Sequence, residues 1–401
     1  MKILHCSDIH LGRRVVGASG KFSDKRFDDY FASFDYIVEY ALANSIDVFV
    51  IAGDLFDKRE LSPEVLLRSE RILSKLKSHN IPCLVIEGNH DNITSGKESE
   101  SWIIYLAEKG MLLRPDYTYI NEEIQFYPIK IGNVNFYGLG YPGIFADELL
   151  GKLSESIAKF DNETNYVIIH TALSSSDFIH GTVKDKEIID KLIGKIDYIA
   201  AGHFHSYNHY PDENPVFFVP GSPEMWDLNE YKQKKGFIIY DSDTKLVEFI
   251  ESKNRDKKVF SLKTDAGDLF TAQTYLTHCL INETIENESI CYLFIELTNQ
   301  FELDIAALEE VLYQKGALKV VTRIYGLGGN NNLDLSGFDS TIGEVELEII
   351  AGWNKFGKIS NETHQLIENL KHFQNEKLEN DFMQTLDVFL DKMIQGEKND
   401  N

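Results

Sequence analysis

The sequence lacks a hydrophobic run long enough to cross a membrane. No stretch of about 18 or more apolar residues is present, and a transmembrane helix needs at least that many. The first residues, MKILHCSDIH, contain no signal-peptide hydrophobic region, because polar side chains begin at His5. We therefore expect an intracellular, cytoplasmic protein without a membrane anchor.

Cysteine and basic residues are both scarce. The 4 cysteines contain no CxxC pair, which favours small buried hydrophobes over disulfides or a zinc site. The 40 Lys and Arg residues are outnumbered by 64 Asp and Glu residues, and the net charge is −24. This balance argues against a general nucleic-acid binder, because phosphate contacts need Lys and Arg. It does not exclude a DNA enzyme whose bound metal ions supply positive charge locally.

The 401 residues, 43% of them apolar, are typical of a globular protein with two or three structural units. Residues 1–255 alternate short apolar runs with helical spacing over 28–45 and 63–79; Ser62 is a candidate N-cap, followed by Pro63 in the first turn. This alternation predicts an α/β sandwich with buried central strands. Three later stretches predict β ribbons of a second sheet: VNFYGLG, PVFFVPG and GFIIYDSDTKLVEFIES.

The pattern changes after residue 255. Residues 256–326 predict a small β-α-β-α-β unit, in which Asp304 caps the second helix. Residues 327–359 begin with a Gly- and Asn-rich linker and contain a short β segment. Residues 360–395 have two amphipathic helical patterns, which favour a seam that binds a partner over helices that pack back on their own domain.

Polar side chains follow each of five apolar runs in the first 255 residues. They are Asp8, His10, Asp54, Asn89, His90, His170, His203 and His205. The carboxyl ends of parallel strands share one edge of an open α/β sheet, so we expect these side chains to converge. The i, i+2 spacing within Asp-x-His and His-x-His would place each pair on one side of an extended chain. Gly53, Gly88 and Gly202 permit sharp turns and a close backbone approach.

Carboxylates, imidazoles and one amide, without thiolates, suit Mn²⁺, Fe or Zn²⁺. The set is too large for one ion, but two ions that share Asp54 would use it, and such pairs polarise phosphoryl oxygens. His90 would then donate a hydrogen bond or a proton to a phosphate ester, and Asp91 would orient its ring. Each short motif alone is commonly accidental, whereas five such strand ends together are not. The other histidines are interpreted as structural or solvated: His5, His79, His180, His209, His278, His364 and His372.

Five motifs carry a family resemblance. SDIHLG (7–12), GDLFD (53–57), GNHD (88–91), IIH (168–170) and GHFH (202–205) resemble, in order and spacing, the calcineurin-like metallophosphoesterase superfamily. Together with VPGSPE…KKGF (219–237), they look like the SbcD-type DNA repair nucleases, relatives of the meiotic-recombination nuclease. The resemblance implies a four-layer α/β/β/α sandwich over 1–255, a small α+β capping domain over 256–326 and a C-terminal helical tail.

The resemblance also implies a ligand set. One Mn²⁺ is held by Asp8, His10, Asp54 and His205, and the other by Asp54, Asn89, His170 and His203; Mg²⁺ or Fe²⁺ are alternatives. His90 is the catalytic histidine. Two positions depart from the family: Asp57 stands where archaeal and eukaryotic relatives often have His, and is either a subfamily mark or a helix cap. Met225 stands where Arg is common after GSPE, which removes one expected phosphate or salt-bridge contact.

The function implied is a Mn²⁺-dependent DNA exonuclease or endonuclease subunit in double-strand-break repair, nucleoid-associated and bound to an SMC-like coiled-coil ATPase. A homodimer through apolar helix surfaces in 28–45 and 63–110 is expected by resemblance. Basic residues near the motifs would contact the DNA backbone, or else be solvated loop charges: Arg13, Arg14, Lys58 and Arg59. Two alternatives stay open, a phosphoesterase acting on a small molecule or protein and a non-catalytic DNA-end-binding scaffold.

Overall fold

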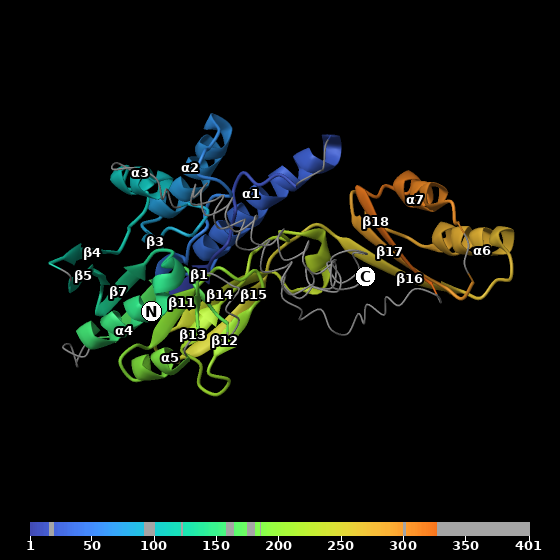
Figure 1. Ribbon diagram of the computed structural model, residues 1–401. Coiled ribbons are helices and arrows are strands. Elements are labelled where there is room, and N and C mark those ends of the chain that lie inside the picture. Colours follow the sequence, from blue (N-terminus) through green and yellow to red (C-terminus); the bar gives the residue numbers. More distant parts are fainter. Residues whose placement is uncertain are drawn as a thin grey trace, which may run out of the picture. The chain divides into compact units, whose positions relative to one another are not determined.

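The structure is a computed structural model (Figure 1), and it describes residues 1–15, 20–91, 101–121, 123–157, 164–174, 181–184, 186–299 and 302–326. The expected linker (327–359) and helical tail (360–395) lie outside the described residues. No described helix is long and apolar enough to cross a membrane.

Two mixed β-sheets form the centre of residues 1–255. The first has the order β15-β14-β1-β2-β3, in which β1, β2 and β3 are parallel. Its strands are β1 (Lys2–Cys6), β2 (Val48–Ile51), β3 (Cys83–Val85), β14 (Gly236–Asp241) and β15 (Leu246–Glu251). The second has the order β12-β13-β11-β8-β7-β6, in which β13, β11, β8 and β7 are parallel. Its strands are β6 (Ile129–Ile131), β7 (Val134–Leu139), β8 (Thr164–Ile169), β11 (Tyr198–Ala201), β12 (Asn208–Tyr210) and β13 (Phe217–Val219).

Two short ribbons and the helices surround these sheets. The ribbons pair β4 (Asp116–Ile120) with β5 (Glu123–Tyr127), and β9 (Ala172–Leu173) with β10 (Thr182–Val183). The helices are α1 (Gly20–Ala43), α2 (Pro63–Ser78), α3 (Trp102–Glu108), α4 (Ala146–Ile157) and α5 (Lys186–Leu192). Short 3₁₀ turns span Gly143–Phe145 and Leu228–Lys232. The Ser62 cap of α2 is confirmed, because its side chain accepts from the Val65 amide. The first helix begins eight residues earlier than its spacing predicted.

Three apolar layers hold the sandwich together. Side chains of β1, β2 and β3 meet those of β7, β8 and β11 between the sheets, as Val50 and Ile168 do. The outer face of the first sheet packs on α1, α2 and α3, and that of the second packs on α4 and α5. Strands β2 and β11 are buried along their whole length, which explains their unbroken apolar runs. The four-layer α/β/β/α arrangement is confirmed, with one change: β14 and β15 extend the first sheet, not the second.

The β-α-β-α-β unit is also confirmed. It consists of β16 (Lys257–Thr264), α6 (Leu269–Asn282), β17 (Ile290–Leu297), α7 (Ile305–Gln314) and β18 (Lys319–Gly326), with its own apolar core. The three strands are parallel, with β17 central, and the Asp304 side chain caps α7 by accepting from the Ala307 amide. We call these residues, 257–326, the capping unit.

Met225 packs against the capping unit. It is buried with Phe22, Ile290, Tyr292 and Phe294. The arginine expected at position 225 is therefore replaced by an apolar contact. The neighbouring Glu224 carboxylate pairs instead with Arg26 of α1, at 3.1 Å.

His5 links the two sheets and makes stability sensitive to acid. Its Nε2 lies 3.0 Å from the Ala201 carbonyl, which only accepts, so Nε2–H donates and Nδ1 accepts from the Tyr198 hydroxyl at 2.9 Å. Burial lowers the pKa of His5 to about 3. The unfolded chain, with an ordinary His pKa of about 6.5, binds a proton that the folded chain rejects. This contribution to stability is complete above the unfolded pKa and is lost as the pH falls toward the folded one.

We expect His5→Gln to flatten the pH dependence of unfolding. Glutamine has the donor and acceptor to keep both partners but does not titrate. Between pH 6 and pH 4, the free energy of unfolding should fall more steeply in the natural protein, by about 1.4 kcal/mol per pH unit. Urea unfolding at several pH values measures this difference. If the free energy of unfolding depends on pH equally in the two proteins, His5 is not the acid-sensitive group.

Candidate metal centre

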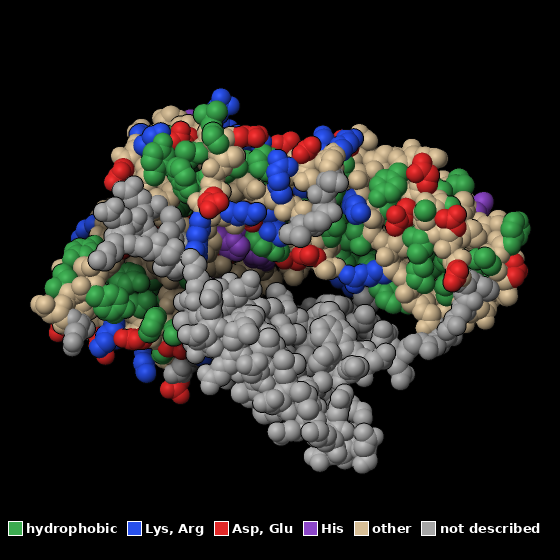
Figure 2. Space-filling model, turned by 45° about the horizontal axis from the view of Figure 1, so that its top comes forward, with side chains coloured by type: hydrophobic (Ala, Val, Ile, Leu, Met, Phe, Trp, Pro, Cys, Tyr) green, Lys and Arg blue, Asp and Glu red, His purple; other side chains and the backbone are tan. Residues whose placement is uncertain are grey.

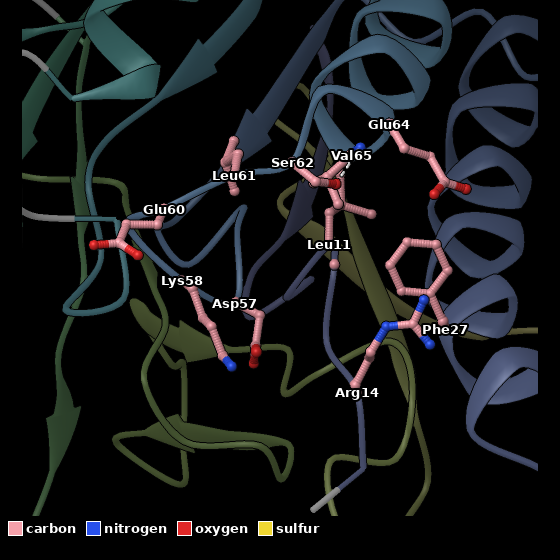
Figure 3. A pocket seen from close by; sticks show the side chains of 11 residues that line it. Leu11, Arg14, Phe27, Asp57, Lys58, Glu60, Leu61, Ser62, Glu64 and Val65 are labelled. Atoms are coloured by element: carbon pink, nitrogen blue, oxygen red, sulfur yellow. Dashed lines mark hydrogen bonds between the residues drawn. The ribbon is translucent and has the colours of Figure 1, made fainter. Parts of the chain in front are cut away.

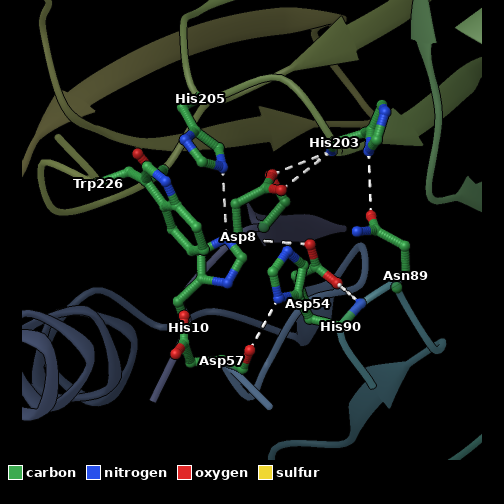
Figure 4. A network of polar contacts seen from close by, with 12 residues as sticks. Asp8, His10, Asp54, Asp57, Asn89, His90, His203, His205 and Trp226 are labelled. Carbon is green, nitrogen blue, oxygen red and sulfur yellow. Dashed lines mark hydrogen bonds and ion pairs between the residues drawn. The ribbon is translucent and has the colours of Figure 1, made fainter. Parts of the chain in front are cut away.

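The predicted polar side chains converge where the carboxyl ends of parallel strands from the two sheets meet. The first sheet supplies five of them, after β1, β2 and β3: Asp8, His10, Asp54, Asn89 and His90. The second sheet supplies three, after β8 and β11: His170, His203 and His205. Figure 4 shows these side chains close together around Asp54, with the exception of His170, which it does not label. The expectation of one open sheet edge was too simple, because the cluster needs the edges of both sheets.

The loops that carry the candidate ligands have unusual backbone conformations. Asp8, His10 and Asp54 have φ of 52°, 52° and 51°, and His203 has φ of 88°. Non-glycine residues with positive φ are uncommon and cluster at functional sites. The i, i+2 argument from an extended chain was wrong, since β1 ends at Cys6 and the chain then turns. Hydrogen bonds fix the turn: the Ile9 and His10 amides both donate to the Asp54 carbonyl, at 2.9 and 3.0 Å.

Two glycines allow the loops to pack this closely. A Cβ at Gly88 would lie 2.0 Å from Asp54 Oδ1, and one at Gly53 would lie 2.3 Å from His170 Nδ1. Real Cβ atoms do not approach other atoms at such distances. The prediction that these glycines permit a close approach is therefore confirmed.

Nitrogen lone pairs and carboxylates face one another on the side of His10. Its Nε2 lies 3.3 Å from His205 Nε2 and 3.9 Å from Asp54 Oδ2. Potential ligand atoms of Asp8, His10 and His205 all lie within 4.8 Å of one another. Among the described residues, the buried Nδ1 of His10 has no hydrogen-bond partner. Two imidazole nitrogens aimed at each other beside a carboxylate fit a shared cation.

A second group lies on the other side of Asp54. Its Oδ2 is 3.3 Å from His170 Nε2. Asn89 Oδ1 lies 3.0 Å from that same nitrogen and 3.1 Å from His203 Nδ1. The Ala52 carbonyl, 2.8 Å from His170 Nδ1, only accepts, so Nδ1 carries the proton and Nε2 turns to the cluster. Asp8 touches both groups: it lies with Asp54 and His170, and its oxygens accept from the His203 amide at 3.1 Å.

Burial and mutual charge shift the pKa values of the cluster in opposite directions. Burial raises the pKa of Asp8 and lowers that of His10 well below its ordinary value. Burial alone would lower the pKa of His170, but the Asp54 carboxylate raises it to about 9. Burial also opposes the charge on Asp54, yet the neighbouring imidazoles hold its pKa below the usual range. Buried carboxylates and imidazoles this close are typical of a site that binds cations.

His90 lies beside the cluster, and its orienting partner differs from the prediction. Its Nδ1 is 2.7 Å from the Asp57 carbonyl oxygen, and its amide donates to Asp54 Oδ1 at 2.8 Å. The Asp91 carboxylate accepts instead from three backbone amides, at 2.9–3.2 Å: Leu55, Phe56 and Gly88. The assignment of Asp91 as the group that orients His90 was therefore wrong. Asp91 fixes the GDLFD loop to the GNHD loop.

The four basic residues proposed for DNA contact have different environments. The Arg13 guanidinium is already used: it pairs with Asp57 at 3.2 Å, donates to the Trp226 carbonyl and stacks on the Trp226 ring. Arg14 and Lys58 line a cavity of about 360 Å³ (Figure 3). Arg14 pairs with the exposed Asp24, and Lys58 and Arg59 are exposed. Figure 2 shows histidine side chains in a recess bordered by Lys and Arg side chains.

Sequence reasoning missed three residues at the site. The Trp226 ring lies against His10 and His90, with ring centroids 4.2 and 5.3 Å apart. Glu230 Oε1 lies 3.3 Å from His205 Nδ1 and Oε2 lies 2.7 Å from Lys235 Nζ. All three lie in the GSPE…KKGF stretch, which the resemblance singled out, so that motif was the available signal.

The remaining histidines lie outside the cluster where they are described. His5 is buried between the sheets, and three others lie on other elements: His79, His209 and His278. Three lie outside the described residues: His180, His364 and His372.

Comparisons with known proteins show what this chain is similar to. The calcineurin-like phosphoesterase family model matches residues 1–207. A DNA double-strand break repair protein Mre11 from Methanosarcina mazei is 28% identical over 80% of this chain and 49% of its own length. One from Saccharolobus solfataricus is 24% identical over 96% of this chain and 98% of its own length. A crystal structure of a dimetal phosphatase from Danio rerio covers 63% of this chain and 97% of that one, with 11% identity and a TM-score of 0.40.

The share of each chain that these matches cover limits what they show about this protein. The chain spans about half the length of the Methanosarcina relatives. Their similarity therefore does not by itself show that this chain has a DNA repair activity. The family match covers more than half of this chain and includes every strand end that carries the cluster, up to His205. With the four-layer fold and the two ligand groups, it shows that the chain belongs to the calcineurin-like phosphoesterase family, whose members depend on two metal ions.

Proposed function

We propose that this chain is a metal-dependent nuclease that hydrolyses DNA phosphodiester bonds in double-strand-break repair. The observation that carries the proposal is the convergence of seven nitrogen- and oxygen-bearing side chains from both sheets, with His90 beside them. The relatives named as DNA double-strand break repair proteins support DNA as the substrate. Metal ions would supply the positive charge that the acidic composition lacks.

The proposed ligands follow the two groups around Asp54. Asp8, His10, Asp54 and His205 would hold one Mn²⁺, and Asp54, Asn89, His170 and His203 the other, with Mg²⁺ or Fe²⁺ as alternatives. The central place of Asp54, with its carboxylate near both His10 and His170, supports its role as the bridge. When bound, such an ion pair polarises the phosphoryl oxygens and activates a water nucleophile.

His90 would deliver a proton to the leaving oxygen. The Asp57 carbonyl only accepts, so Nδ1 of His90 keeps its hydrogen and Nε2 is left to exchange a proton with the substrate. The Trp226 ring packs beside His90 and limits the rotation of its imidazole. The P–O bond to the leaving group breaks as that oxygen takes the proton, which returns His90 to its neutral form.

Basic side chains near the site would contact the phosphate backbone of an extended DNA substrate. Arg14, Lys58 and Arg59 would contact phosphates next to the scissile bond, whereas Arg13 would hold Trp226 and Asp57 in place. The proposal also includes an SMC-like coiled-coil ATPase bound through 360–395. It further includes a homodimer formed by apolar helix surfaces in 28–45 and 63–110, where Leu67 is exposed. Exonuclease and endonuclease activities are both compatible with this site.

Competition between substrates tests the proposal. The purified chain should hydrolyse a chromogenic phosphodiester with Mn²⁺, and linear duplex DNA should inhibit this hydrolysis while it is itself cleaved. If duplex DNA neither inhibits nor is cleaved, the site serves a small phosphodiester. If DNA ends bind with high affinity but no phosphodiester is hydrolysed, the chain is a DNA-end-binding scaffold. Lys58→Glu should weaken inhibition by DNA and leave hydrolysis of the small substrate unchanged.

A further inference from the structure

Glu230 contacts the candidate ligand His205 from behind. Its Oε1 lies 3.3 Å from His205 Nδ1, on the side of the ring opposite to the cluster. A carboxylate only accepts, so Nδ1 must carry the hydrogen and Nε2 must present its lone pair. That Nε2 is the atom that lies 3.3 Å from His10 Nε2. Carboxylates that accept from the second nitrogen of a metal-binding histidine fix its tautomer and raise its basicity.

Glu230 is itself held in place. Its Oε2 lies 2.7 Å from Lys235 Nζ and 2.9 Å from the amide of Trp226, which donates to it. Lys235 is buried, and its ammonium also donates to the His205 carbonyl at 2.8 Å and to Ser222 Oγ at 3.1 Å. The pair therefore restrains both the ring and the backbone of His205. A buried lysine that pairs with a largely covered glutamate contributes little net stability, because desolvation offsets their attraction, so a role at the site explains the arrangement better.

The other face of the same segment packs on the capping unit. Tyr231 stacks on Tyr292 of β17, with ring centroids 4.4 Å apart and an interplanar angle of 25°. Leu228 packs in the same apolar cluster, and Asn229 accepts from Arg323 of β18. We call residues 226–235 the bridging segment, because Trp226 and Glu230 contact the metal cluster whereas Leu228, Asn229 and Tyr231 contact the capping unit.

We propose that Glu230 is a positioning residue that aims His205 at its metal ion, and that the bridging segment makes this aim depend on the docked capping unit. The inference rests on the metal sites of the proposed function. It adds that movement of the capping unit changes the affinity of one site for Mn²⁺ by changing the orientation of His205. The affected site is the one that includes Asp8 and His10, and the site beside Asn89 keeps its affinity.

Metal titration without DNA tests the positioning role. Metal-free protein is titrated with Mn²⁺, and free Mn²⁺ is counted by electron paramagnetic resonance. We expect Glu230→Ala to weaken one of two Mn²⁺ sites by about 10- to 100-fold. Glu230→Gln should recover most of this loss, because its amide oxygen still accepts from Nδ1. Glu213→Ala, at an exposed loop position, is the matched control and should bind both ions normally.

The outcomes separate the possible roles. Equal weakening of both sites, or no recovery with Glu230→Gln, together with a lower melting temperature of the metal-free protein, would mean a structural role only. Unchanged binding in Glu230→Ala would overturn the positioning role while leaving the nuclease proposal intact. Two Mn²⁺ bound by the natural chain without any DNA cleavage would refute the nuclease and leave the positioning role standing.

A second variant tests the link to the capping unit. Tyr292→Ala removes the ring on which Tyr231 stacks and lies far from the ligands along the chain. We expect it to weaken the same Mn²⁺ site several-fold. Tyr275→Ala, at an exposed position on α6, is the control for the capping unit. Normal Mn²⁺ binding by Tyr292→Ala would refute the link.

Discussion

Asp54→Asn should abolish phosphodiester hydrolysis by this chain. The carboxylate lies near both ligand groups, with Oδ2 3.3 Å from His170 Nε2 and 3.9 Å from His10 Nε2. An amide of the same size keeps the packing but removes the negative charge that two cations would share. Loss of the ions removes several kcal/mol of transition-state stabilisation, which corresponds to a fall in kcat of about 10³-fold or more. Initial rates with saturating Mn²⁺ measure the effect.

The control for this substitution is Asp212→Asn, which makes the same chemical change in an exposed loop. It should hydrolyse the substrate at the natural rate. The folded state of Asp54→Asn is checked by its circular dichroism spectrum. Hydrolysis within tenfold of the natural rate in a folded Asp54→Asn protein would contradict the bridging role.

His90→Asn should separate catalysis from metal binding. The His90 side chain lies beside the ligands, and its Nδ1 is turned to the Asp57 carbonyl, so its loss removes a proton donor and no proposed ligand. General acid catalysis contributes about 10²- to 10⁴-fold, and we expect kcat to fall by that amount. Mn²⁺ affinity should stay unchanged in a direct titration.

His79→Asn, at the exposed end of α2, is the matched control and should retain full activity. A substrate with a good leaving group gives a sharper test. Such a leaving group needs no proton, so His90→Asn should lose much less activity on it than on DNA. Equal losses on both substrates would show that His90 acts in another way, for example by binding the phosphate.

The convergence of the candidate ligands could be predicted from the sequence because these residues follow buried parallel strands. An apolar run such as VFVIAG marks a strand that is covered on both faces, and the residue after it must lie at a carboxyl edge. The sequence does not show which edges meet, because that depends on the packing of two sheets through side chains such as Val50 and Ile168. The left-handed conformations of Asp8 and His10 were also beyond prediction, since they depend on hydrogen bonds to the Asp54 carbonyl.

The errors and omissions have a common physical cause. Asp91 is adjacent to His90 in sequence, which suggested contact, but its carboxylate accepts from three backbone amides instead. Trp226 and Glu230 follow no strand end, so the rule that found the ligands could not find them. Their positions depend on the bridging segment, which is placed by long-range contacts with β17 and with α1. Local patterns predict local structure well and such contacts poorly.

The most direct test of the account is a Mn²⁺ titration of the metal-free chain during cleavage of linear duplex DNA. We expect no cleavage without metal, full cleavage once two Mn²⁺ are bound, and loss of cleavage when a chelator is added. Cleavage that persists in the chelator, or no cleavage of DNA or of any phosphodiester with two Mn²⁺ bound, would contradict it.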